Sequence, residues 1–364
     1  MMGRCQVDET AKVSSCGMNT MPMECYMVLN SFAQKTSIAV LCSICGILCI
    51  LENSLVLYLI FASPKIRKKP SYLFISSLAL ADVLASIVFV CSFLDFHVFN
   101  RTDSSKEIFL LKLGGVNTSF TASLGSLLLM AFDRYVCIYR PSEYKVIVTR
   151  KRAVVAMAVM WIATIITAFL PLMGWNCCRL NSACSELFPF VDSKYLSSWI
   201  CLVMILLVCI VYTYVRVLWK AHKHTVYMEK RQSQAGKRNA KMRMDVTLAK
   251  TLVMVLAVVM TCWSPVLALM MYSLFVSLND HIRKVFAFCS TLCLVNSMVN
   301  PIVYALRSRE LRSSLRKTSS RFRKKVIASE SSPTPEADST LKSLPIETIC
   351  GDIVYNTHMN LLKA

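Results

Sequence analysis

The chain has 364 residues, enough for two or three ordinary domains, but its composition argues against a water-soluble protein. Apolar residues make up 55% and charged residues 17%, against roughly 25% charged in typical soluble domains, and the mean hydropathy is +0.52. The hydrophobicity excludes a disordered chain, and the scarcity of charge excludes a coiled coil. A net charge of +20 on so apolar a chain indicates a membrane protein with basic faces.

Seven apolar runs follow one another along the chain, each long enough to cross a bilayer as a helix. A bilayer core of roughly 30 Å needs about 20 helical residues. The seven runs contain no Asp, Glu, Lys or Arg other than Glu52 in the first and Asp82 in the second. The runs are 36–64, 71–94, 113–132, 153–178, 195–215, 251–279 and 285–306. They predict an all-α membrane protein, a seven-transmembrane helix bundle over 37–306 that follows an extracellular N-terminal segment, 1–36.

The connectors differ strongly in charge and therefore set the direction of the bundle. Connectors on one side, together with 307–325, hold 29 Lys and Arg residues, whereas the opposite side holds 10. Because basic loops stay in the cytoplasm, we expect a multi-pass plasma-membrane protein with an extracellular N-terminus. The segment 307–325 reads as a short amphipathic eighth helix on anionic lipid. The segment 326–364, rich in Ser, Thr, Pro and Glu, reads as a disordered cytoplasmic tail.

Polar residues inside the apolar runs form a recognisable series. Ionisable groups at membrane depth are costly and usually face the interior of a bundle. In chain order the series is Asn53, Asp82, Asp133-Arg134-Tyr135, Trp161, Cys262-Trp263-Ser264-Pro265 and Asn300-Pro301-Ile302-Val303-Tyr304. Over 36–320 this series resembles the rhodopsin-like (class A) G-protein-coupled receptors. A transporter, a channel or a membrane enzyme is disfavoured, because the sequence shows no repeats, no metal-spaced His cluster and no nucleophile beside a base.

The resemblance implies an activation mechanism. Pro265 and Pro301 each remove a backbone hydrogen bond and kink their helices, which lets the sixth span swing outward to admit a G-protein helix. Arg134 would pair with Asp133 and reach Asp245 at rest. The implied switch residues are Asp133, Arg134, Tyr135, Tyr214, Asp245, Trp263, Pro265, Asn300, Pro301 and Tyr304. Asp82, Ser123 and Asn296 would hold an allosteric sodium ion, and we expect no other metal or cofactor.

The outer halves of the spans indicate the kind of ligand. The stretch Lys112–Asn117 lacks the acid that binds amine ligands, and 285–306 lacks the lysine of an opsin. Rings are abundant there instead: Phe89, Phe93, Phe96, His97, Phe120, Phe188, Tyr195, Trp199, Trp263 and Phe286. They predict an apolar cavity for an uncharged lipophilic ligand, with Ser290 as its best hydrogen-bond partner. The segment 21–32, rich in Met and aromatic residues, is a candidate lid.

Two departures from the class narrow the family. Most rhodopsin-like receptors bridge the outer end of the third span to the second extracellular loop, but 100–116 has no cysteine. That loop, which follows the fourth span, instead carries Cys177, Cys178 and Cys184. We favour a Cys177–Cys184 bridge, with Cys178 left open as the partner of Cys184. The fifth span, 195–215, has no proline. Both departures are shared by the cannabinoid receptors, and the local sequence resembles their type 2 branch in FVCSFLDFHVF, FTASLGSLLLMAFDRY, CSELFP and FAFCSTLCLVNSMVNPIVYALRS.

This resemblance implies 2-arachidonoylglycerol and anandamide as ligands, coupling to heterotrimeric Gi/o proteins that inhibit adenylate cyclase, arrestin recruitment by a phosphorylated tail, and no nucleic-acid partner. By position it adds Val116, Asn117 and Val266 to the ligand contacts; Asn117 departs from the Thr of type 2 receptors. Asn100 lies in a sequon and is a candidate glycosylation site. The alternative, a lysophospholipid-type receptor, would need several cations for its phosphate.

Overall fold

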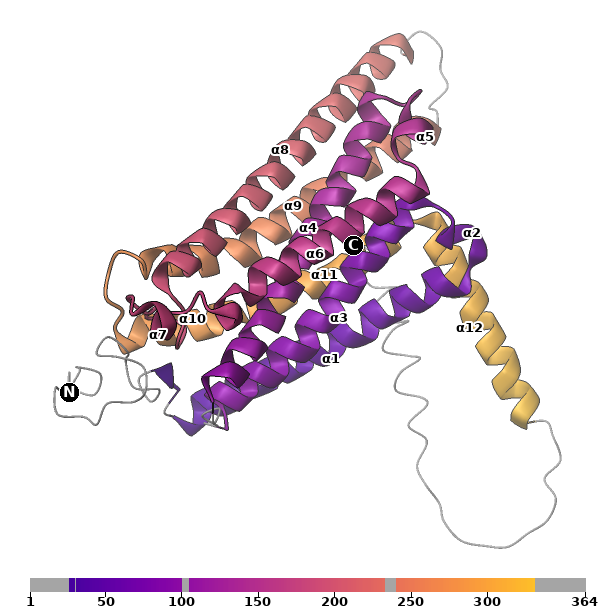
Figure 1. Cartoon of the computed structure of the whole chain (residues 1–364). Helices are drawn as coiled ribbons and strands as arrows, with labels where there is room; N and C mark the ends of the chain where they lie inside the picture. Colours follow the sequence, from indigo (N-terminus) through magenta and orange to yellow (C-terminus); the bar gives the residue numbers. More distant parts are fainter. Residues whose placement is uncertain (1–25, 30, 100–104, 233–239, 331–364) are drawn as a thin grey trace, which may run out of the picture. The chain divides into compact units, whose positions relative to one another are not determined.

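The chain is almost entirely helical. The computed structural model describes residues 26–29, 31–99, 105–232 and 240–330, and in these ranges it has twelve helices and no strand (Figure 1). The helices are α1 Phe32–Ala62, α2 Pro64–Arg67, α3 Pro70–His97, α4 Lys106–Tyr139, α5 Tyr144–Ile147, α6 Arg150–Met173, α7 Cys177–Leu180, α8 Ser193–Gln232, α9 Ala240–Tyr272, α10 Asp280–Ser290, α11 Leu292–Arg307 and α12 Arg309–Glu330. The chain divides into two units, Met1–Arg316 and Lys317–Ala364, and the first contains the bundle.

The seven predicted spans are confirmed. Helices with membrane-spanning length and hydropathy cover Phe32–Ala62, Pro70–His97, Lys106–Tyr139, Arg150–Met173, Ser193–Lys223, Val253–Tyr272 and Asp280–Val303. Their outer faces carry large apolar side chains that are more than half exposed, such as Leu51 at 58%, Val155 at 61% and Ile205 at 61%. Because water would penalise so much contiguous apolar surface, these faces lie against lipid. The chain is a multi-pass membrane protein.

Helix ends follow local sequence signals. Pro70 occupies the first turn of α3, where its missing N–H costs nothing. The side chains of Ser105, Thr149 and Asn279 each accept a hydrogen bond from a backbone N–H in the first turn of α4, α6 and α10. Gly174 ends α6 at a φ of 131°, a conformation that other residues rarely adopt. Most consecutive spans pack as neighbours, α1 with α3, α3 with α4, α4 with α6 and α8 with α9, whereas α8 packs against α4 rather than α6.

The third span, α4, lies at the centre of the bundle. It packs against α3, α6 and α8, and more than half of its most apolar window is buried. Close approach to α6 requires small residues: a Cβ on Gly114 would lie 2.7 Å from the ring of Phe169, and one on Gly125 would lie 2.9 Å from Met160. A central α4 brings its outer half to the cavity and its inner half, ending at Asp133-Arg134, to the opposite end.

The seventh span is broken in its middle. Helix α10 ends at Ser290, Thr291 donates its N–H to the carbonyl oxygen of Phe288, and α11 begins at Leu292. The apolar run 285–306 had predicted one continuous helix with a kink at Pro301. The helix also begins five residues earlier than that run, because the cap residue Asn279 starts it at Asp280.

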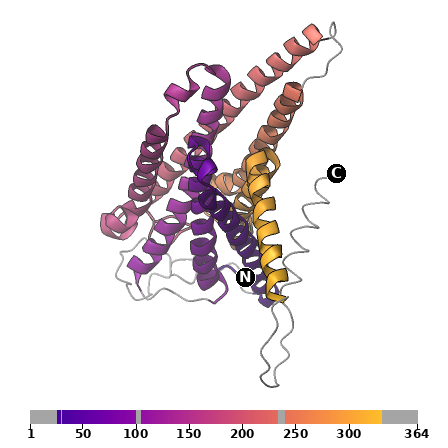
Figure 2. The same cartoon turned by 90° about the vertical axis from the view of Figure 1, so that its right-hand side faces the viewer.

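Helices α8 and α9 are longer than the apolar runs that predicted them. They pack against each other, and α8 projects beyond the other helices at the end where α5 lies (Figures 1 and 2). Their polar extensions, 216–232 and 240–250, carry eight of the ten lysines and arginines of the basic connector 216–250. The helix that follows the bundle, α12, runs to Glu330, five residues past the predicted amphipathic segment.

Candidate ligand-binding site

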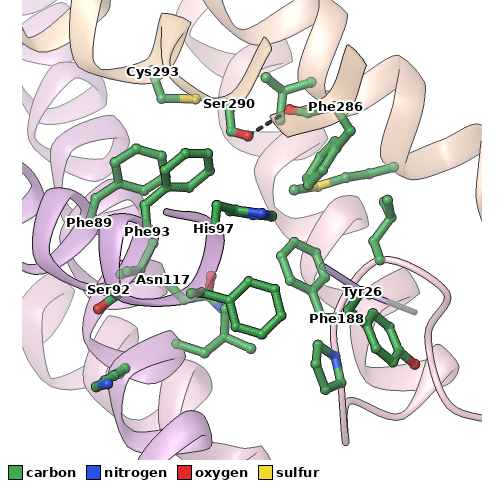
Figure 3. Close-up of a pocket in the computed structure, with 18 of the residues that line it drawn as sticks. Tyr26, Phe89, Ser92, Phe93, His97, Asn117, Phe188, Phe286, Ser290 and Cys293 are labelled. Atoms are coloured by element: carbon green, nitrogen blue, oxygen red, sulfur yellow. Dashed lines mark hydrogen bonds between the residues drawn. The ribbon is translucent and has the colours of Figure 1, made fainter. Parts of the chain in front are cut away.

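A cavity lies between the helices at the end of the bundle opposite α5. Its walls come from α3, α4, α8, α9, α10 and α11, and from the connector between α7 and α8 (Figure 3). The lining residues are Tyr26, Val28, Phe89, Ser92, Phe93, Phe96, His97, Phe109, Lys112, Leu113, Val116, Asn117, Phe120, Glu186, Leu187, Phe188, Pro189, Trp199, Trp263, Val266, Met270, Arg283, Phe286, Ser290 and Cys293.

Aromatic rings pack against one another along the cavity wall. Phe89 stacks on Phe93 with ring centroids 5.0 Å apart and meets Phe120 edge to face at 5.6 Å. Phe120 in turn meets the indole of Trp263 at 5.8 Å. These geometries are favoured by the ring quadrupoles and hold the wall rigid. The result is a mostly apolar surface that extends from α3 across α4 to α9.

The structure brings together every predicted ligand contact except Tyr195. The ring of Tyr195 is buried beside Trp175, and its hydroxyl donates to the carbonyl oxygen of Thr167 at 3.2 Å. Asn117 lines the cavity and donates to the same hydroxyl at 3.5 Å. Tyr195 therefore supports Asn117 from behind rather than facing the cavity. Sequence position could not distinguish these roles, because both residues lie on cavity-forming helices.

Ser290, His97 and Trp263 each bring a polar atom to the otherwise apolar wall of the cavity. The Ser290 hydroxyl donates to the Phe286 carbonyl oxygen at 2.6 Å, so only its oxygen lone pairs remain for a ligand (Figure 3). His97 Nδ1 and Trp263 Nε1 are buried and have no hydrogen-bond partner among the described residues. Buried polar atoms are normally satisfied, so these two nitrogens are candidate partners for a ligand's polar atoms.

Part of the candidate lid, 21–32, lines the cavity, and residues 21–25 and 30 of it lie outside the described residues. Tyr26 and Val28 line the cavity and are almost fully buried, whereas Phe32 is 85% exposed and takes no part. The Tyr26 hydroxyl donates to the carbonyl oxygen of Ser185 at 2.9 Å, which ties the segment to the connector between α7 and α8. Burial raises the pKa of Tyr26 to about 12, so its hydroxyl keeps the proton that it donates.

Two cations reach the cavity, and each is paired with an acid. Lys112 Nζ lies 3.4 Å from Asp95 Oδ2, and Arg283 Nη2 lies 3.5 Å from Glu186 Oε2. Glu186 also accepts the backbone N–H of Leu278, which fixes its carboxylate between two connectors. These ion pairs could not be predicted from the sequence. Partners such as Glu186 and Arg283 are 97 residues apart, and no local pattern joins them.

The connector between α7 and α8 is held by the predicted disulfide. Cys177 is bonded to Cys184, so the structure decides against Cys178 as the partner of Cys184. Short bridges of Asn176 with Val191 and of Cys184 with Asp192 fold the connector back on itself. This folding presents Phe188 to the cavity, where its ring meets Phe286 edge to face at 5.7 Å.

A polar network surrounds Asp82 in the middle of the bundle. Asp82 is fully buried, and its carboxylate accepts hydrogen bonds at 2.8 Å from Ser123, Ser297 and Asn300. Ser123 takes the predicted place, and Ser297 and Asn300 are added to it. Asn296 Oδ1 is buried without a hydrogen-bond partner among the described residues. The Asp82 carboxylate and the hydroxyl oxygens of Ser123 and Ser297 are hard oxygen ligands of the kind that suit a sodium ion.

The predicted switch residues of α4 also form a network. Arg134 bonds to Asp133 and donates to the Ser71 hydroxyl at 2.7 Å. Asp133 further accepts from Ser71 at 3.0 Å and from the Tyr144 hydroxyl at 2.8 Å. The carboxylate therefore joins α3, α4 and α5. Ser71 and Tyr144 were missed because a serine and a tyrosine at the beginning of a helix carry no signal of their own.

The remaining switch residues are placed in part. Tyr214 is buried on α8, Tyr135 stacks on Tyr139, and Pro265 and Pro301 lie inside α9 and α11. The side chains of Asp245 and Tyr304, and all of Asn100, lie outside the described residues.

Comparison with known proteins agrees with this arrangement. Residues 52–304 match the family described as 7 transmembrane receptor (rhodopsin family). Cannabinoid receptor 2 of Homo sapiens is 54% identical over 313 residues, which cover 86% of each chain. Cannabinoid receptor 2 of Mus musculus is 54% identical over 312 residues, covering 86% of this chain and 89% of the relative. Cannabinoid receptor 1 of Taricha granulosa is 54% identical over 310 residues, covering 82% of this chain and 65% of the relative.

Proposed function

The chain belongs to the rhodopsin family of seven-transmembrane receptors and to its cannabinoid receptor branch, and from this premise we propose that it is activated by endocannabinoids, 2-arachidonoylglycerol and anandamide, and signals through Gi/o proteins. It is a receptor and not an enzyme. In this proposal the N-terminus is extracellular, the receptor lies in the plasma membrane, and Gi/o inhibits adenylate cyclase.

One observation carries the choice of ligand: the cavity is walled by rings, and both cations that reach it are balanced by acids. A long acyl chain gains by leaving water for such a wall. An uncharged headgroup loses little hydration there and finds scattered polar partners, namely His97, Ser290 and Asn117. An amine would require an unpaired acid at the cavity, and neither Glu186 nor Asp95 offers one.

Activation in this proposal runs through Trp263. Its indole lines the cavity, touches Phe120 and lies two residues before Pro265, which interrupts the hydrogen bonding of α9. A ligand that shifts the indole biases the bend of α9 and thereby the opening at the other end, where Asp133 and Arg134 lie. A bistable helix of this kind converts a small contact change into a large movement.

We also assign two regulatory features to the proposed receptor. A sodium ion bound at Asp82 and Ser123 would supply a fixed positive charge that favours the resting arrangement of the bundle. Phosphorylation of serines and threonines in 313–320 and 329–343 would recruit arrestin, because phosphates add charge that basic partners bind.

Cells expressing the chain test the ligand class directly. Cyclic AMP is measured after stimulation of adenylate cyclase, with 2-arachidonoylglycerol and sphingosine 1-phosphate compared at matched concentrations. We expect 2-arachidonoylglycerol to lower cyclic AMP in a pertussis-toxin-sensitive manner, because the toxin blocks Gi/o. A response to sphingosine 1-phosphate alone would instead establish the alternative, a lysophospholipid-type receptor.

A further inference from the structure

We propose that Asn117 is a specificity-determining residue that offers the cavity a hydrogen-bond acceptor, and that Tyr195 is the positioning residue that holds its amide in this orientation. The receptor thus selects uncharged lipids whose headgroup donates a hydrogen bond, through an O–H or an N–H, over lipids whose headgroup only accepts. The inference rests on the proposed function, because it assumes that an uncharged lipid occupies the cavity, and it names the headgroup chemistry that the cavity prefers.

The orientation of these groups begins at a proline in α6. Pro171 lies inside that helix and has no N–H. In a regular helix, residue 171 would donate to the carbonyl oxygen of Thr167. The Tyr195 hydroxyl donates to this carbonyl oxygen instead, at 3.2 Å, and also lies 3.4 Å from the carbonyl oxygen of Ala168. Because a buried carbonyl oxygen rarely stays unpaired, the hydroxyl proton of Tyr195 is committed to α6.

The committed proton decides how the amide of Asn117 is turned. A tyrosine hydroxyl has one proton to donate, so toward Asn117 its oxygen acts only as an acceptor. The amide nitrogen therefore faces Tyr195, where Nδ2 donates to the hydroxyl oxygen at 3.5 Å. Tyr195 is 4% exposed and packs edge to face on Trp175, with ring centroids 5.9 Å apart, so its hydroxyl stays in place.

The amide oxygen is left for a ligand. Asn117 lines the cavity, and within the described part of the chain its Oδ1 receives no hydrogen bond (Figure 3). Ser290 has the same polarity, because its hydroxyl donates to the carbonyl oxygen of Phe286 and meets a ligand as an acceptor. Side chains on α4 and α10 therefore both accept hydrogen bonds from whatever occupies the cavity.

Such a wall discriminates between headgroups by what they donate. A headgroup O–H or N–H gives up its hydrogen bond with water on entering the cavity and regains one at Asn117 Oδ1. A headgroup without a donor displaces water from this oxygen and leaves it unpaired, which costs free energy. Sites built to pair a polar group of the ligand reject analogues that lack that group.

Two lipids with the same acyl chain test the inference. N-arachidonoylethanolamine donates through its N–H and its O–H, whereas its N-methyl, O-methyl derivative keeps both oxygens and donates nothing. Their affinities are measured by competition against a labelled uncharged agonist on membranes from cells expressing the full chain. The readout is the ratio of the two affinities. Comparing this ratio between variants cancels the bulk of the added methyl groups and any general damage to the cavity.

We expect the ratio to favour the ethanolamide in the unmodified chain and to fall about fivefold in Asn117→Leu, the size of one net hydrogen bond. Tyr195→Phe keeps Asn117 but frees its amide to turn the nitrogen toward the cavity. The ratio should then fall about twofold or more, although Tyr195 does not line the cavity. The matched control is Tyr212→Phe, which removes a hydroxyl from the outer face of the same helix, where Tyr212 is 61% exposed. Its ratio should equal that of the unmodified chain.

Each variant decides one part of the inference. An unchanged ratio in Asn117→Leu would overturn the role of Asn117 as the acceptor, and an unchanged ratio in Tyr195→Phe would overturn positioning by Tyr195. An equal shift in the Tyr212 control would overturn both. In all three cases the unmodified chain still binds the ethanolamide, so the proposed function stands. Failure of the unmodified chain to bind the ethanolamide would count against the proposed function itself.

Discussion

Replacing Tyr144 by Phe removes one hydroxyl from the network at the inner end of α4. That hydroxyl donates to Asp133 Oδ1 at 2.8 Å, and it is the only hydrogen-bond donor to this oxygen among the described residues. Asp133 is 2% exposed, so water cannot replace the lost donor. Hydrogen bonds to a charged group contribute about 1.5–3 kcal/mol. At 1.4 kcal/mol per factor of ten, the docked state of α5 should weaken roughly 10- to 150-fold.

Hydrogen exchange of the purified receptor measures this change. The amides of Val146, Ile147 and Val148 form the hydrogen bonds that define α5, and they should exchange faster in the variant by that factor. Tyr212→Phe is the matched control, because Tyr212 is 61% exposed on the outer face of α8. Unchanged exchange in α5, or an equal change in the control, would refute the assignment of Tyr144 as the tether.

The effect should be independent of pH through the neutral range. Burial raises the pKa of Tyr144 above its ordinary value of 10.0, and the neighbouring Asp133 carboxylate adds to the rise, although the bond with Ser71 lowers it in part. The folded state thus favours the neutral phenol, so the tether is fully present below the ordinary pKa and is lost only as pH rises through the raised value. Protection should therefore differ between the unmodified chain and Tyr144→Phe by the same factor from about pH 6 to 9.

Three further outcomes follow from the contacts described. Trp263→Ala should reduce agonist potency about tenfold or more while surface expression changes less, measured by cyclic AMP and surface labelling; equal losses would deny the residue a switch role. In Asp82→Asn, sodium chloride should no longer lower agonist affinity relative to potassium chloride, and persistence of the sodium effect would locate the ion elsewhere. Replacing Cys177 and Cys184 by Ser opens a short loop, so the free energy of unfolding should fall by about 2–3 kcal/mol, seen as a lower melting temperature; no change would show that the connector is held by its other contacts.

Much of the fold could be predicted because the bilayer imposes a length on every span. Apolar runs of the required length gave all seven helices, and Pro70, Asn279 and Gly174 explain where three of them begin or end. The break at Thr291 could not be predicted, since the surrounding sequence is apolar and contains neither proline nor glycine at that point. The polar extensions of α8 and α9 were also missed. The apolar runs stop at the membrane surface, whereas the helices continue beyond it.

The candidate site was predictable to the extent that it is made of rings. Bulky aromatic residues in the outer halves of several spans converge when those spans pack around α4, and the structure places them so. Tyr195 is the exception, because its hydroxyl finds the carbonyl oxygen of Thr167 and draws the ring away from the cavity. The balanced cations were missed because each pair joins different elements, so only the tertiary structure shows that Arg283 meets Glu186.

The interruption at Thr291 has a mechanical consequence. Arg283, Phe286 and Ser290 lie on the segment before it, and Asn300, which donates to Asp82, lies on the segment after it. A continuous rod would transmit a push on its outer half as a translation of the whole span. An interrupted span instead turns the same push into a change of angle at Thr291. The inner half then stays anchored by its own hydrogen bonds, while the outer half adjusts to ligands of different size.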